Sequence, residues 1–187
     1  MSGSPLRNSL WGAVMLVAAV AVAIVAIAAS GAYNVAADAP QKPVVSRFIA
    51  WVRERSVDVR SDGIMIPPLN RSEMIRDGAS DYDEMCTGCH LAPGLPENEI
   101  RPGLDPKPPL LAQAPAADPR EQFWIIKHGI KMTAMSAWGK THIDEEIWNM
   151  VAFLQRLPGL SPPAYRALVT KGGGHHHEMG EADHMKM

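Results

Sequence analysis

Apolar residues are concentrated near the start of the chain. No charged residue occurs from Asn8 to Ala37, and the stretch from Leu10 to Ala29 is almost wholly apolar. A helix of about twenty such residues rises roughly 30 Å, which is the thickness of the hydrocarbon core of a bilayer. The pattern predicts a transmembrane anchor over residues 10–33, with a short cytoplasmic N-terminus over residues 1–9.

A cleaved signal peptide is the alternative interpretation of this segment. Small residues at Ala26-Ile27-Ala28 and at Val35-Ala36-Ala37 could each form a cleavage site. The apolar region of a signal peptide usually spans only ~7–15 residues, so the uncleaved anchor is favoured.

A second helical pattern lies in the linker that we expect over residues 34–70. Apolar residues recur there at helical spacing, with Arg47, Arg53, Glu54 and Arg55 available to the solvent side, and predict a short amphipathic helix. The apolar positions are Val44, Val45, Phe48, Ile49 and Val52. This helix can lie on a membrane surface or pack on the following domain. The second arrangement is favoured, because Ile64, Ile66 and Leu69 continue the apolar pattern.

The central part of the chain alternates predicted helices with a proline-rich loop. Repeated prolines between Pro93 and Pro109 forbid regular helix there. Asp118 followed by Pro119 is a typical helix start, and Gly129 is a natural stop. A further helix is expected to begin between Thr141 and Asp144.

Candidate chemistry is concentrated in five residues that read C-x-x-C-H, from Cys86 to His90. In an exported protein two such thiols add to the vinyl groups of haem, and the adjacent imidazole becomes an iron ligand. The motif therefore predicts one covalent haem c, with Cys86 and Cys89 as thioether ligands and His90 as an axial ligand.

Three other interpretations of the two cysteines are weaker. A thioredoxin-like site would need a βαβ pattern around the motif. A zinc site would need further ligands at short spacing, and the chain has only 2 cysteines. A disulfide between Cys86 and Cys89 would close too small a loop to stabilise the fold much.

Residues 71–165 resemble a mono-haem class I cytochrome c. Members of that family share an N-terminal helix that ends at C-x-x-C-H, with a glycine and an aromatic residue before the first cysteine, and Gly78 and Tyr82 occupy those places. The resemblance implies an all-α class I cytochrome c fold, which we expect over residues 71–168. It also implies that the last helix of the domain crosses the first one at this pair, with Met150 and Phe153 at the packing positions.

The second axial ligand is expected in the segment from Lys131 to Gly139. Many bacterial relatives carry Gly-Met-Pro-Ala-Trp or Gly-Met-Pro-Ala-Phe there, with that methionine on the iron, and Ala134-Met135-Ser136-Ala137-Trp138 corresponds to it. The resemblance thus assigns Met135, with Met132 as the alternative. A thioether ligand stabilises ferrous iron and suits an electron carrier.

The resemblance also implies a partner for the other ring nitrogen of the axial histidine. In the family, a proline carbonyl in the loop after the motif accepts that proton and orients the ring. Pro102 and Pro109 both fit this role, and the sequence does not choose between them.

The C-terminal segment, residues 169–187, lacks an apolar period and is expected to be disordered. It is rich in histidine and methionine, which together suit copper. Its candidate ligands are His175, His176, His177, Met179 and His184.

These features predict a function in electron transfer. The net charge of -2, without a basic run, gives no support for a nucleic-acid partner. Haem attachment belongs outside the cytoplasm, so we expect a single-pass protein of the inner membrane with its haem domain in the periplasm. The predicted function is that of an electron carrier rather than an enzyme, alone or in a respiratory or dehydrogenase complex, with redox proteins as partners. A haem-based redox or gas sensor and a copper-handling protein are the alternatives.

Overall fold

The computed structural model describes residues 5–39 and 41–172, and every regular element in these residues is helical. The all-α prediction is therefore confirmed. The elements are α1 (Pro5–Ala29), α2 (Pro43–Ser61), α3 (Ser72–Met85), α4 (Thr87–His90), the 3-10 turn η1 (Arg101–Gly103), α5 (Pro119–His128), the 3-10 turn η2 (Trp138–Lys140), α6 (Asp144–Leu154) and α7 (Pro162–Val169).

The chain divides into two compact units, with the boundary after residue 40. The first unit contains α1. Its span Ser9–Ala29 has a mean hydropathy of 2.8, and none of it is buried. Among the described residues, α1 is the helix that is long and apolar enough to cross a membrane. This agrees with the span predicted from the apolar run.

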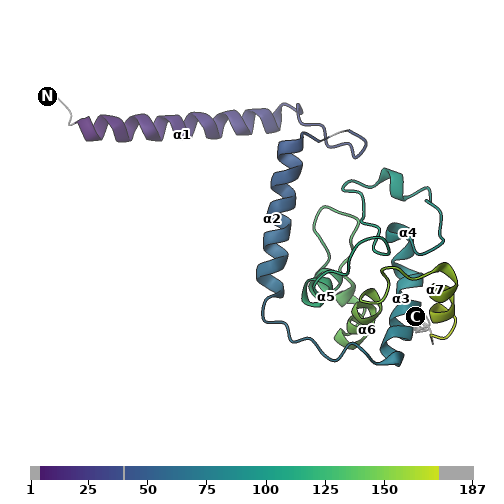
Figure 1. The fold of residues 1–187 in the computed structure, drawn as a ribbon. Helices are drawn as coiled ribbons and strands as arrows, with labels where there is room; N and C mark the ends of the chain where they lie inside the picture. Colours follow the sequence, from purple (N-terminus) through teal and green to yellow (C-terminus); the bar gives the residue numbers. More distant parts are fainter. Residues whose placement is uncertain (1–4, 40, 173–187) are drawn as a thin grey trace, which may run out of the picture. The chain divides into compact units, whose positions relative to one another are not determined.

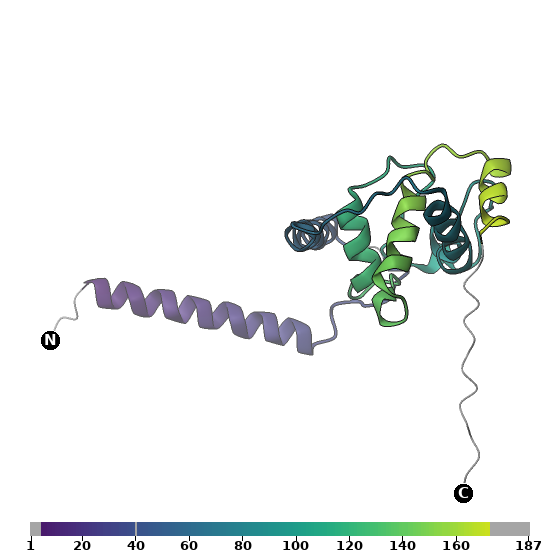
Figure 2. The ribbon, with the colours of Figure 1, turned by 90° about the horizontal axis from the view of Figure 1, so that it is seen from below.

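The second unit contains the remaining helices. Neighbouring helices pack in the order α2, α5, α6, α3 and α7 (Figure 1). Figure 2 shows the same helices from below, with α6 between α5 and α3. The fully buried side chains come mainly from α6 and include Ile147, Met150 and Phe153.

The crossing of α3 and α6 depends on Gly78. A Cβ atom at this position would lie 1.9 Å from the backbone oxygen of Asn149, so only glycine allows the two backbones to approach this closely. Beside the glycine, the rings of Tyr82 and Phe153 pack with their centroids 5.3 Å apart. The expected contact between the glycine-aromatic pair and the last helix of the domain is confirmed.

Local signals in the sequence set the bounds of the shorter helices. The side chain of Asp118 accepts a hydrogen bond from the backbone N–H of Arg120 at 2.7 Å, and Pro119 opens α5. Gly129 ends the helix with a φ of 65°, which favours glycine. At the start of α6, the Glu146 carboxylate accepts from the backbone N–H of Ile143 at 2.9 Å.

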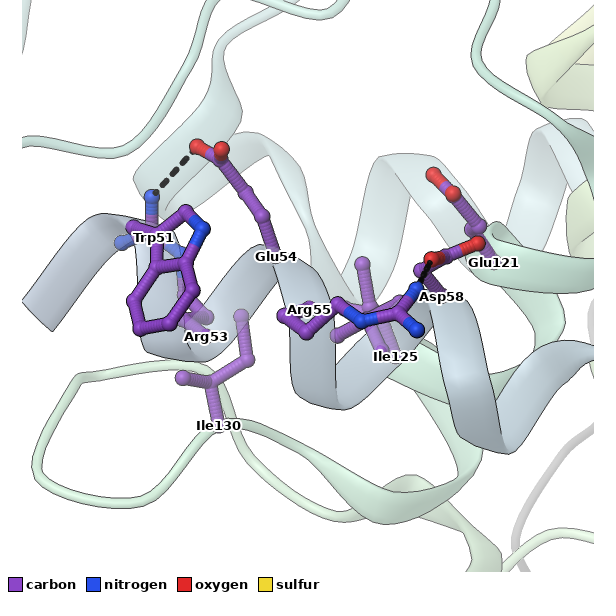
Figure 3. A pocket seen from close by; sticks show the side chains of 9 residues that line it. Trp51, Arg53, Glu54, Arg55, Asp58, Glu121, Ile125 and Ile130 are labelled. Atoms are coloured by element: carbon purple, nitrogen blue, oxygen red, sulfur yellow. Dashed lines mark hydrogen bonds and ion pairs between the residues drawn. The ribbon is translucent and has the colours of Figure 1, made fainter.

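Helix α2 is longer than the short helix expected from its apolar pattern. Its C-terminal half carries the buried residues Val57 and Ser61 and packs against α5. A groove of about 300 Å³ lies along this contact (Figure 3). Trp51 and Arg53 of α2 line it together with Ile125 of α5 and Ile130.

Candidate haem site

Two short helices bring the residues of the C-x-x-C-H motif onto one turn. Helix α3 ends at Met85, and α4 begins at Thr87. The backbone oxygen of Cys86 accepts from the N–H of Cys89 at 3.1 Å and from the N–H of His90 at 2.9 Å. Both cysteines are free thiols, and neither forms a disulfide. The turn thus carries two thiols and an imidazole within a few residues of one another.

The first thiol of the motif packs against the hydrophobic core. Burial raises the pKa of the Cys86 thiol to about 12, and the charges of Asp81 and Cys89 add to this shift. A zinc ligand or a redox nucleophile would need the opposite shift, because the thiolate is the reactive form. As a free thiol, Cys86 is therefore protonated at neutral pH.

The ring of His90 is held by a distant backbone carbonyl. Its Nδ1 lies 2.9 Å from the oxygen of Pro109. A carbonyl oxygen can only accept, so the ring nitrogen donates and the proton is at Nδ1. Nε2 then carries the lone pair that an iron ligand requires. Of the two prolines that the sequence offered, Pro109 makes this contact.

The direction of the pKa shift of His90 agrees with this tautomer. Burial lowers the pKa of His90, the hydrogen bond to Pro109 opposes this effect, and the positive charge of Arg101 lowers the pKa further. The neutral imidazole is the form that binds a metal. Burial and the neighbouring guanidinium therefore both favour the ligating form.

Arg101 connects the motif to the segment that holds His90. Its side chain is buried, and its Nε donates to the backbone oxygen of Cys89 at 3.1 Å. Its Nη2 donates to the oxygen of Pro108 at 2.7 Å, and its Nη1 contacts Glu97 at 2.8 Å. One guanidinium thus fixes α4 relative to the residue preceding Pro109.

Asn98 makes a second connection between the loop and the motif. Its Nδ2 donates to the backbone oxygen of Gly88 at 2.7 Å, and its Oδ1 accepts from the N–H of Arg101 at 3.0 Å. Sequence reasoning identified neither Asn98 nor Arg101. Asn98 lies in an irregular loop and Arg101 opens the short turn η1, and no periodic pattern in the sequence marks such positions.

The two candidate methionines differ in their surroundings. Met132 is fully exposed, with a relative accessibility of 100%, and has a positive φ of 57°. Met135 is partly buried and packs against the hydrophobic core. Its backbone is fixed on both sides, because its N–H donates to Thr133 Oγ1 at 3.1 Å and its oxygen accepts from the N–H of Ile130 at 3.1 Å. Of the two, Met135 has the environment of a residue that faces a buried group.

Gly129 allows the methionine loop to fold back on α5. A Cβ atom at this position would lie 2.7 Å from the backbone oxygen of Met135 and 2.8 Å from the backbone N of Ala137. The glycine therefore ends α5 and also brings the loop that contains Met135 against the helix end.

The residues present fit a covalently bound haem. The free thiols lie on the same turn as an imidazole whose Nδ1 is already bound, which leaves Nε2 for iron. Partly buried apolar side chains from the segments before and after α5 pack against the same core; they include Leu111, Met135 and Trp138. Apolar side chains of this kind would exclude water from a large apolar ring bound beside them. The groove beside α2 has none of these ligands in its lining.

The predicted tail site lies outside the described residues. This applies to His175, His176, His177, Met179 and His184, so copper binding by the tail stays a prediction. Within the described part of the chain, no group of three or more His, Cys, Asp or Glu side chains is arranged to hold a metal ion.

The central part of the chain matches a known protein family. Residues 73–154 match the family model described as cytochrome C oxidase, cbb3-type, subunit III. Comparison with curated proteins gives no match, and comparison with solved structures gives none either. The matched segment runs from the first turn of α3 to the end of α6 and includes the C-x-x-C-H motif and Met135.

Proposed function

Since residues 73–154 form a class I c-type cytochrome domain in a haem-based electron-transfer protein, we propose that the chain is a membrane-tethered periplasmic electron carrier with His90 and Met135 as axial ligands. In this proposal α1 is an uncleaved anchor in the inner membrane, and redox proteins are the partners. The carrier works alone or as a subunit of a respiratory or dehydrogenase complex.

The observation that carries the proposal is the arrangement around His90. The proton at Nδ1 is held by the oxygen of Pro109 at 2.9 Å, and Cys86 and Cys89 lie on the same turn as free thiols. A haem c bound there supplies a one-electron ferric/ferrous couple. The chain's own contribution is to tether the ring through the thiols, to fix the imidazole, and to exclude water with the surrounding apolar side chains.

The choice of Met135 as the sixth ligand rests on burial and loop geometry. Its side chain packs against the core, whereas Met132 is fully exposed. A thioether is a neutral, soft ligand that favours ferrous iron and raises the reduction potential. If His90 and Met135 both held the iron, no position would be left for a substrate, which would favour electron transfer over catalysis.

Carbon monoxide binding tests this assignment. We expect the reduced, haem-loaded protein to keep its spectrum when carbon monoxide is added, because both axial positions are filled. Met135→Ala should open one position and form an adduct, and the matched control Met132→Ala should behave like the wild type. An adduct in the wild-type protein would favour the sensor function, and an adduct only in Met132→Ala would move the ligand assignment to Met132.

A further inference from the structure

Helix α2 has two faces with different surroundings. Val57 and Ser61 are buried on the face that packs against α5. Successive residues of an α-helix are about 100° apart around its axis, which places the partly buried Ala50 and Arg53 on the same side. This face attaches α2 to the haem domain.

The opposite face is apolar and exposed over the first half of the helix. Its residues cover an arc of about 160° around the axis. They are Val44, Val45, Phe48, Ile49, Trp51 and Val52, and we call them the apolar arc of α2. Trp51 lies at the edge of this arc, where it also lines the groove beside α5. Val44 has a relative accessibility of 76%, and Phe48 and Trp51 each have 61%. The rings of Phe48 and Trp51 lie together, with centroids 6.0 Å apart. A contiguous apolar patch of this kind indicates a surface that binds something.

The charges around the apolar arc favour an anionic partner. From Lys42 to Arg53 every charged residue is basic. The first acidic residue, Glu54, lies 3.7 Å from Arg53 in an ion pair (Figure 3). A helix with tryptophan and phenylalanine on one face and arginines at its borders is typical of helices that lie in the headgroup region of a bilayer.

The covalent chain keeps this helix close to a membrane. α1 ends at Ala29 and α2 begins at Pro43. A fully extended connection of this length spans at most about 50 Å. If α1 crosses the bilayer, the first turn of α2 is always within that distance of the headgroups, so lipid is the partner present at the highest local concentration.

We propose that the apolar arc of α2 inserts into the lipid headgroup region, with Lys42 and Arg47 against anionic lipids. The inference rests on the proposed function in one respect, namely that α1 is a membrane anchor. Because the other face of α2 packs on α5, insertion of the arc holds the haem domain at the bilayer surface. The domain would then exchange electrons with partners in or on the membrane. It would not move through the whole volume that a flexible tether allows.

Fluorescence quenching by lipids tests the insertion. The full-length, haem-loaded protein carries an environment-sensitive nitrobenzoxadiazole label at Val44→Cys and is reconstituted in phosphatidylcholine nanodiscs, with or without phosphatidylglycerol. In the haem-loaded protein, thioether bonds to haem would keep Cys86 and Cys89 from reacting with the label. We expect nitroxide lipids to quench the label, more strongly with phosphatidylglycerol. The control label at Arg166→Cys, exposed on α7, should not be quenched.

A second variant tests the contribution of the apolar arc itself. Phe48→Glu changes an exposed side chain, so the haem spectrum should be unaffected. The variant removes a phenyl ring that would be buried in lipid and adds a negative charge. The ratio of inserted to free helix should therefore fall about tenfold or more. Quenching of the label that is unchanged by this variant would overturn the proposal.

The outcomes separate failure of the arc from failure of the anchor. Protein that elutes with the nanodiscs but carries an unquenched label in both lipids overturns the inference and leaves the anchor intact. A label that is shielded from water but not quenched by lipid means that a protein or a second copy covers the arc, which also overturns it. Protein that does not elute with the nanodiscs overturns both the inference and the membrane tether of the proposed function.

Discussion

Replacement of Arg101 by methionine tests the connection between the C-x-x-C-H motif and the loop that orients His90. The variant keeps the length and apolar part of the side chain but loses the three contacts of the guanidinium, to Cys89, Pro108 and Glu97. The backbone oxygens of Cys89 and Pro108 both lose a charged donor. We therefore expect a loss of stability and a less firmly oriented imidazole.

The size of the stability loss follows from the two backbone carbonyls that lose their donor. A buried acceptor left without its partner costs about 1–3 kcal/mol, and part of this is recovered because the buried charge is removed. We assign no loss of stability to the broken contact with Glu97, because its carboxylate is half exposed and keeps its ion pair with Lys107 at 3.1 Å. The expected loss is about 2–4 kcal/mol of unfolding free energy.

Denaturant unfolding of the haem-loaded protein measures this loss, with circular dichroism for the helices and haem absorbance for the site. Arg156→Met on the exposed surface is the matched control and should change stability by less than about 0.5 kcal/mol. Arg101→Lys should fall between the two, because one ammonium group cannot reach three acceptors that fit a planar fork. A stability of Arg101→Met equal to that of the control would refute the reasoning.

Two further predictions concern the packing of α3. Gly78→Ala should destabilise the protein by about 3 kcal/mol or more, measured by thermal or denaturant unfolding, because the added Cβ would lie 1.9 Å from the oxygen of Asn149. Tyr165→Phe should cost about 1 kcal/mol at neutral pH, because the hydroxyl donates to Asp83 at 2.6 Å. Burial and that carboxylate raise the pKa of Tyr165, so its contribution is complete below the unfolded pKa of about 10 and declines as the pH rises above it. Denaturant unfolding as a function of pH should therefore show a shallower alkaline decline in the variant.

Matched substitutions control for both variants. Gly103→Ala places a Cβ where no other atom lies within 4 Å and should leave stability nearly unchanged. Tyr33→Phe removes an exposed hydroxyl and should leave the alkaline decline as in the wild type. Equal stability of the Gly78 and Gly103 variants would contradict the close crossing, and an alkaline decline unaffected by Tyr165→Phe would contradict the role of that phenol.

The sequence by itself determined the features that depend on neighbouring residues. The apolar run of α1 has the length of a membrane span because the rise per residue is fixed. Asp118, Pro119 and Gly129 bound α5 through contacts within one turn. The C-x-x-C-H motif places its thiols and imidazole on one turn for the same reason, so its chemistry could be predicted before the fold was known.

Only the tertiary structure decided which distant residues meet. It selected Pro109 over Pro102 as the partner of His90 and buried Arg101 between α4 and Pro108. It also attached one face of α2 to α5 and left the other face exposed. These contacts join segments that are far apart in the chain or belong to irregular loops, where no periodic pattern applies. They form because the core around α6 brings the loops together, and the local sequence does not contain that information.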